Sequence, residues 1–136
     1  MSRLFLLFFQ SYVSLHSYGQ KILYPWSYTS ARIKDWYDLQ QMGEIMAKEI
    51  RKTSGDYYEV GRESTIQAYQ TIGGSGDWAR GAMGIKWVFL FELPPGKFPN
   101  NGPDAFMLPA RGIKPTAKSI FQAFRKMAIE VSHRIL

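Results

Sequence analysis

The chain of 136 residues contains no cysteine, which excludes disulfide bonds, cysteine-ligated zinc sites and thiol nucleophiles. It also has no apolar run near the roughly 18 residues that a helix needs to cross a bilayer, so we expect no membrane-spanning segment. With 46% hydrophobic and 15% aromatic residues, and no internal repeat, the composition is typical of a globular protein. At this length we expect a single domain, spanning residues 1–136, with one core.

Histidine is scarce. The two histidines are His16 and His133, and neither starts a His-x-x-Glu pair or belongs to a His-Glu-x-x-His motif, since Gly19 and Leu136 stand three residues after them. A catalytic zinc needs three protein ligands, so a self-contained zinc site is not expected. His133 lies near the end of a predicted helix, where a cation interacts favourably with the helix dipole, and we expect a structural role for it.

Clustered positive charge is missing too. The 17 lysines and arginines exceed the 11 acidic residues and give a net charge of +6. They occur singly or in pairs such as Arg51-Lys52, without the continuous stripe that follows a phosphate backbone. The pattern indicates a solvated surface, so neither nucleic acid nor a membrane is predicted as a partner.

The start of the chain resembles a signal peptide only in part. An apolar stretch at 4–9 follows Arg3, but its six residues fall short of the usual length of about 7–15, and no small-x-small cleavage site follows. We therefore interpret 5–15 as a strand that is buried on both faces, because such strands appear as nearly continuous apolar runs.

Apolar periodicity predicts the main elements of an α/β fold. Apolar residues three and four apart predict helices over 33–53 and 116–134. The run 87–91 predicts a second buried strand, and two shorter strands are expected at 22–24 and 57–60. Helices placed between strands indicate a sheet with crossover connections.

The remaining segments are predicted as connections. We expect Asp77 to cap a short helix that ends near Gly84, and the proline-rich segment 94–103 to be a surface loop. The glycine loop Gly74-x-Gly76-x-x-Ala79 fits a relaxed dinucleotide fingerprint. The residues before it do not form an apolar strand, so no nucleotide site is predicted there.

Two polar residues, His16 and Glu92, stand where predicted apolar strands end. Parallel strands present their carboxyl ends at one edge of the sheet, where ligands bind in open α/β folds, so these side chains form a site hypothesis. Two alternatives remain open from the pattern alone: His16 as a histidine satisfied by a backbone partner, and Glu92 as a solvated carboxylate. If Glu92 is partly desolvated, its pKa should rise towards that of a general base.

Several segments resemble a known family. Tyr12 to Gln20 and Ile22 to Thr29 resemble the His-Ser-Tyr region of pancreatic-type, carboxypeptidase A/B-like zinc metallocarboxypeptidases, and three further blocks agree in order, at 68–78, 84–93 and 106–117. The match covers the C-terminal part of the family's catalytic domain, a little less than half of it. The resemblance implies an α/β fold, namely the C-terminal portion of a mixed, mostly parallel sheet flanked by helices.

The same resemblance implies roles for individual residues. His16 matches the third zinc ligand, and Glu92 matches the general base that takes a proton from the zinc-bound water and passes it to the leaving amine. Tyr69 matches the mobile tyrosine that closes over the C-terminal residue of a peptide or protein substrate. Without the resemblance, Tyr69 would be interpreted as a surface loop residue.

The resemblance also assigns substrate contacts. Ser17, Tyr18 and Phe106 match residues that line the subsites upstream of the cleaved bond. Gly76 matches the base of the specificity pocket, which would be roomy and uncharged here. The segment after Glu92 departs from the family's short charged turn at Pro94-Pro95 and over 98–104, which affects the upstream subsites.

The family's His-x-x-Glu zinc pair does not appear in the chain, and neither do the arginines and asparagine that bind the terminal carboxylate and the oxyanion. One ligand cannot hold zinc, so we expect the chain alone to be inactive. The alternative is a non-catalytic binding module, or half of a split enzyme that needs an N-terminal partner. The resemblance further implies an extracellular, secreted protein.

Overall fold

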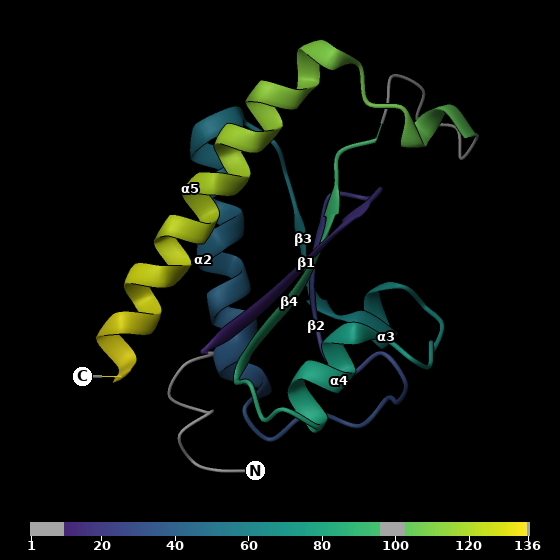
Figure 1. The fold of residues 1–136 in the computed structure, drawn as a ribbon, viewed down its shortest axis with the longest axis vertical. Coiled ribbons are helices and arrows are strands. Elements are labelled where there is room, and N and C mark those ends of the chain that lie inside the picture. Colours follow the sequence, from purple (N-terminus) through teal and green to yellow (C-terminus); the bar gives the residue numbers. More distant parts are fainter. Residues whose placement is uncertain (1–9, 96–102, 136) are drawn as a thin grey trace.

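The computed structural model describes residues 10–95 and 103–135 (Figure 1). Its strands are β1 (Ser11–Ser17), β2 (Lys21–Tyr24), β3 (Glu59–Arg62) and β4 (Trp87–Leu93). Its helices are α2 (Trp36–Ser54), α3 (Glu63–Ile66), α4 (Ser75–Gly81), the 3-10 helix η1 (Pro103–Phe106) and α5 (Ala110–Ile135). Among these described helices, none combines the length and the apolar character that a membrane crossing requires.

The four strands form one mixed sheet in the order β1-β4-β2-β3. β1 runs parallel to β4, β2 runs parallel to β3, and β2 is antiparallel to β4. Two of the three pairings are parallel, and helix α2 is the crossover that joins β2 to β3. The predicted mixed, mostly parallel α/β sheet is therefore confirmed.

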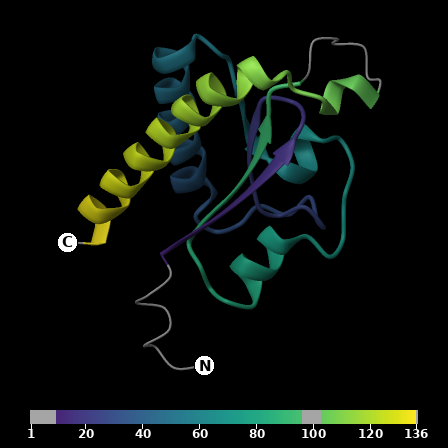
Figure 2. The same ribbon diagram turned by 45° about the horizontal axis from the view of Figure 1, so that its top comes forward.

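Helices cover both faces of the sheet. The long helices α2 and α5 pack together on one face, and α4 lies against β1 and β4 on the other (Figures 1 and 2). Along β4, Phe89 and Phe91 point into the main core with α2 and α5, whereas Val88 packs with Ala79 of α4. Side chains alternate along a strand, so Glu92 projects on the α4 side.

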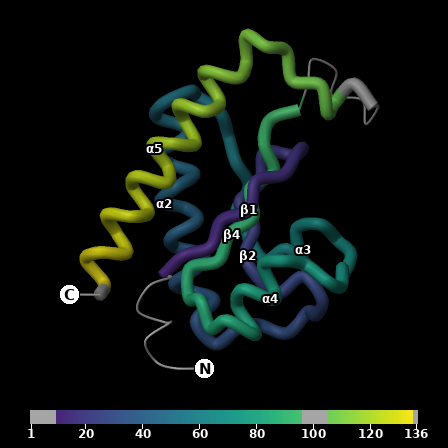
Figure 3. Tube along the Cα trace, in the orientation of Figure 1, coloured from purple at the N-terminus to yellow at the C-terminus, as the bar shows by residue number. Residues whose placement is uncertain are grey.

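Strand β1 is less buried than the sequence predicted. The interpretation of 5–15 as a strand buried on both faces is wrong for the described part, because β1 is half-buried or exposed along its length and Leu15 is 52% exposed. Residues 5–9 lie outside the described residues. Within the described sheet, β1 pairs with β4 alone and so forms an edge. Figure 3 shows the chain trace of β1 running along β4.

The helix boundaries differ from the predictions in identifiable ways. Helix α5 begins at Ala110, six residues before the predicted start at Thr116, and contains Pro115. Proline has no backbone N–H, so one carbonyl group in the preceding turn of the helix loses its donor. Pro115 is exposed, so water can reach that carbonyl group. Strand β3 lies two residues later than predicted, and α3 was not predicted at all. Most of the predicted loop at 94–103 lies outside the described residues.

Close packing of α2 on the sheet depends on Gly43. A Cβ atom at this position would overlap Cγ1 of Val60 on β3, and β-branched valine has little freedom to move away. We expect Gly43→Ala to lower the free energy of unfolding by about 1–3 kcal/mol, the usual cost of overpacking. In the matched variant Gly76→Ala, the new Cβ would lie 3.5 Å from Val88, an ordinary contact.

Because alanine is the better helix former, Gly76→Ala is expected to keep or raise stability. Thermal and denaturant unfolding of both variants, followed by circular dichroism, measures the difference. Equal stability of the two variants would contradict the packing argument.

Candidate functional site

His16 and Glu92 are direct neighbours across the parallel pair β1 and β4. The register pairs His16 with Glu92 one residue before both strands end. Paired residues share a face of the sheet, so both side chains project on the α4 side. The prediction that these two residues meet at the carboxyl ends of parallel strands is confirmed.

Glu92 sits in a partly desolvated position between His16 and Lys21. On its other side, the antiparallel register pairs Glu92 with Lys21 of β2. Its Oε2 atom is buried and has no hydrogen-bond partner among the described residues. Burial raises the pKa of Glu92, and the charges of His16 and Lys21 oppose that shift. The alternative of a fully solvated carboxylate does not describe it, and the group is suited to accepting a proton.

His16 is accessible for a ligand. Its side chain is exposed, and its Nε2 atom lies 3.0 Å from the hydroxyl oxygen of Ser14 on the same strand. His16 therefore contacts a side chain, whereas the alternative interpretation predicted a backbone partner for it. In the described part of the chain, no three His, Cys, Asp or Glu side chains are grouped to hold a metal ion. These residues therefore do not fit a complete zinc site.

Asp77 ties helix α4 to the loop after β2. Its carboxylate accepts hydrogen bonds from the backbone N–H of Ser27 (3.0 Å), the backbone N–H of Tyr28 (3.1 Å) and the hydroxyl group of Ser27 (2.6 Å). The prediction that Asp77 caps its own helix is wrong. The helix begins two residues earlier, and its N-cap is Gly74, which makes no side-chain cap. The aspartate stabilises a long-range contact instead.

Sequence analysis missed a second carboxyl group near Glu92. Glu63, at the start of α3, is half-buried, and its pKa is raised to about 7 by burial and by the negative charges of Asp77 and Glu92. No apolar pattern precedes Glu63 to mark it as a strand-end residue. Glu63 thus experiences the negative charges of Asp77 and Glu92 on the α4 side of the sheet.

The raised pKa of Glu63 makes stability depend on pH. The folded value of about 7 exceeds the ordinary value of 4.5, so the folded state binds more protons between these limits. Stability therefore falls as the pH rises through this window. We expect Glu63→Gln, which cannot ionise, to be more stable than the parent chain at pH 8 by about 2 kcal/mol after allowance for solvent screening.

At pH 4 the gain from Glu63→Gln should vanish, because both states of the parent chain are then protonated. Glu59→Gln is the matched control, since Glu59 is exposed on β3, four residues away. Denaturant unfolding at the two pH values measures the effect. A gain that does not change with pH would contradict the assignment.

Two of the predicted substrate contacts are brought together. The rings of Tyr18 and Phe106 meet edge to face with centroids 4.9 Å apart, although the residues are far apart in the sequence. Ser17 ends β1 directly before Tyr18 and is exposed. Phe106 is 63% exposed, so the pair forms an aromatic wall that a ligand can reach.

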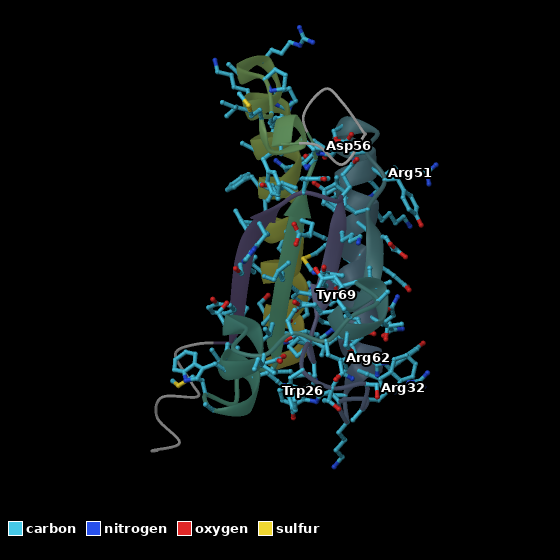
Figure 4. All side chains as sticks on the ribbon, turned by 90° about the vertical axis from the view of Figure 1, so that its right-hand side faces the viewer. Trp26, Arg32, Arg51, Asp56, Arg62 and Tyr69 are labelled. Carbon is cyan, nitrogen blue, oxygen red and sulfur yellow. The ribbon has the colours of Figure 1, made fainter. Side chains whose placement is uncertain are left out.

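Gly76 and Tyr69 lie in the segment that leads from α3 into α4. Gly76 stands over β4, because a Cβ atom there would contact Val88 at 3.5 Å. Tyr69 is exposed in the loop after α3 and donates a hydrogen bond to Oε1 of Gln67 at 2.8 Å (Figure 4). The structure does not record a contact between Tyr69 and Glu92.

An open cavity of about 620 Å³ adjoins this segment. Its lining includes Asp77 and three aromatic or aliphatic side chains that are largely exposed, namely Tyr28, Ile72 and Trp78. Exposed apolar groups gathered on one surface are typical of an interaction or ligand site. His16, Glu92 and this cavity thus all lie on the α4 side of the sheet.

Comparison with known proteins places this geometry in context. A family profile described as zinc carboxypeptidase matches residues 7–123. The chain is 35% identical to carboxypeptidase B of Astacus astacus over 117 residues, which are 86% of the chain and 37% of that protein. It is 38% identical to carboxypeptidase A1 of Bos taurus over 110 residues, or 81% of the chain and 25% of that protein.

A solved structure agrees with these relatives. Bovine thrombin-activatable fibrinolysis inhibitor, solved in complex with tick carboxypeptidase inhibitor, superposes with a TM-score of 0.78 at 31% identity. The superposition covers 92% of this chain and 40% of that one. In every one of these comparisons the chain spans less than half of its relative.

Proposed function

Since the chain belongs to the zinc carboxypeptidase family, we propose that it forms the C-terminal part of a catalytic domain that hydrolyses the C-terminal peptide bond of peptides and proteins. The observation that carries this proposal is the pairing of His16 with Glu92 at the ends of two parallel strands, with a buried, unpartnered oxygen on Glu92.

In this proposal Glu92 is the general base. It accepts a proton from the attacking water and then donates that proton to the leaving amine, a role that suits a carboxyl group whose pKa is raised by burial. His16 provides one ligand for zinc, and the remaining ligands come from outside the described residues. Zinc, when bound, lowers the pKa of water and polarises a carbonyl group.

We assign the substrate contacts to further positions in the chain. Tyr18 and Phe106 provide an aromatic wall for residues upstream of the cleaved bond, beside Ser17. Tyr69, 59% exposed on its loop, is free to close over the C-terminal residue of the substrate. Gly76 leaves the specificity pocket roomy and without charge of its own, so it does not select an acidic or a basic side chain.

We propose that the chain alone is inactive, because one histidine cannot hold a catalytic zinc ion. The test is hydrolysis of a blocked dipeptide by the purified 136-residue chain after incubation with zinc. We expect no turnover and no stoichiometric zinc by metal analysis. Hydrolysis by the zinc-loaded chain that disappears in Glu92→Gln would contradict the proposal.

We further propose that the chain acts together with an N-terminal segment, as half of a split enzyme. Two observations favour a partner: the outer edge of β1 is unpaired within the described sheet, and the apolar side chain of Leu15 on this strand is 52% exposed. An unpaired strand edge is a ready template for another strand. A segment that carries a His-x-x-Glu pair would complete the zinc ligands.

Co-expression with an N-terminal half from a related carboxypeptidase tests the partnership. We expect co-purification, one zinc ion per complex and peptidase activity. Leu15→Glu should weaken the complex, whereas Phe121→Glu, at a position on α5 that is also more than half exposed, should not. Co-purification without zinc or activity would instead support a non-catalytic binding module.

We also propose a secreted location, which rests on the family resemblance alone. The absence of cysteine means that the chain does not depend on disulfide formation for stability. Expression of the complete gene product with a C-terminal tag, followed by assay of medium and cells, tests the proposal. Retention of the tag inside the cells would contradict it.

A further inference from the structure

A second cavity, of about 260 Å³, lies between α2, β3 and α3. None of its lining residues is among those assigned to the proposed peptidase site. Arg32, in the loop before α2, and Arg62, at the end of β3, both line it, and Figure 4 shows them near one another at the same end of the molecule. Trp36, Val60 and Ile66 supply apolar walls. The cavity thus combines two cations with apolar surface.

Each guanidinium group contacts an uncharged side chain. Arg62 donates from Nε and Nη2 to the hydroxyl oxygen of Thr65, at 3.0 and 2.6 Å. The guanidinium carbon of Arg32 lies 4.6 Å from the ring centroid of Trp36. Among the ion pairs of the described residues, none involves Arg32 or Arg62. Their positive charges are therefore ordered but not neutralised.

The acidic residues at the start of α2 are already used elsewhere. Asp35 pairs with Arg80 at 2.6 Å, and Asp38 pairs with Lys86 at 2.5 Å. Asp35 and Asp38 would have to break these ion pairs to turn towards the cavity. Further along the helix, Glu44 accepts a hydrogen bond at 2.8 Å from Gln40, which itself lines the cavity.

The polar floor of the cavity is satisfied internally. The hydroxyl group of Tyr24 donates to Oε1 of Gln40 at 3.0 Å, and the Gln40 amide nitrogen also reaches the carbonyl oxygen of Val60 at 3.4 Å. Burial raises the pKa of Tyr24, Arg62 and Arg32 oppose that shift, and the negative charge of Glu44 adds to it. Both guanidinium groups therefore act on the same point of the floor, where Glu44 acts in the opposite sense.

From this arrangement we infer that the cavity binds a small organic carboxylate. A guanidinium fork matches the planar geometry of a carboxylate, and two forks can share its oxygens. The apolar walls suit a compact hydrocarbon body, and the volume is below that of typical drug-sized pockets. Benzoate has both features and serves as the probe.

The test is titration of the 136-residue chain with benzoate, followed through the backbone amide NMR signals of Gly61 and Arg62 at fixed ionic strength. We expect saturable shifts with benzoate. Benzamide, which has the same shape but no charge, should bind at least about tenfold more weakly. Phenyl phosphate is the third probe, because it replaces the planar carboxylate with a tetrahedral dianion.

Arg32→Gln and Arg62→Gln should each weaken benzoate binding by about tenfold or more. Arg51→Gln is the matched control, because Arg51 is exposed on α2 in a different cavity beside Asp56 (Figure 4). Its binding should equal that of the parent chain. Circular dichroism checks that each variant is folded.

Several results would overturn the inference. They are the absence of saturation by benzoate, equal binding of benzamide, an equal loss in Arg51→Gln, or binding of phenyl phosphate without benzoate. If an arginine variant fails to fold, the comparison of benzoate with benzamide on the parent chain decides alone. Binding should persist in Glu92→Gln, so this inference and the proposed peptidase function fail or succeed separately.

Discussion

Glu92→Gln should abolish activity in the complex of this chain with an N-terminal half, lowering kcat/KM by about 10³-fold, within the usual range for removal of a general base. Glutamine has nearly the same shape but cannot accept the proton of the attacking water. Zinc content should not change, because Glu92 is not proposed as a ligand. The measurement is hydrolysis of a blocked dipeptide, combined with metal analysis of the same sample.

The stability of Glu92→Gln separates a catalytic role from a structural one. Burial raises the pKa of Glu92, so its ionised form is unfavourable in the folded state at neutral pH, and removal of the charge should not lower the melting temperature. Glu130→Gln is the control, since Glu130 lies on α5 in an ion pair with Lys126. Activity of Glu92→Gln within a few-fold of the parent complex would contradict the assignment.

Much of the fold could be predicted because its local patterns agree with its packing. The apolar residues of α2 recur at helical spacing, and the buried members, Leu39, Met42, Met46 and Ile50, face the sheet. The run at β4 predicted a central strand, and the strand lies between two neighbours. The edge position of β1 could not be predicted, because an apolar run does not show how many neighbours a strand has.

The site was predicted in part for a similar reason. His16 and Glu92 end their strands, and strand ends are visible in a sequence. Lys21 acts on Glu92 from another element, and Glu92 in turn acts on Glu63; these positions depend on an antiparallel register and on the unpredicted helix α3. A local pattern cannot show such contacts, because they arise only when distant segments pack together.

The largest loss of stability is expected in Asp77→Ala. Asp77 is the shared acceptor for three donors on Ser27 and Tyr28, and Ser27 is 1% exposed, so water cannot readily replace the lost acceptor. Hydrogen bonds to charged groups contribute about 1.5–3 kcal/mol each but are not additive within a network. We expect the free energy of unfolding to fall by about 3–4 kcal/mol.

Asp77→Asn should lose about half as much, because its amide group retains one oxygen acceptor. Asp56→Ala is the control, since Asp56 accepts from Ser54, two residues away, and should change stability by less than about 0.5 kcal/mol. Urea unfolding of the three variants gives the ranking. If Asp77→Ala unfolds at the same urea concentration as Asp56→Ala, the contact does not hold α4 in place. Gly76, on that helix, would then owe its position over β4 to the apolar contacts of Ala79 and Val88 instead.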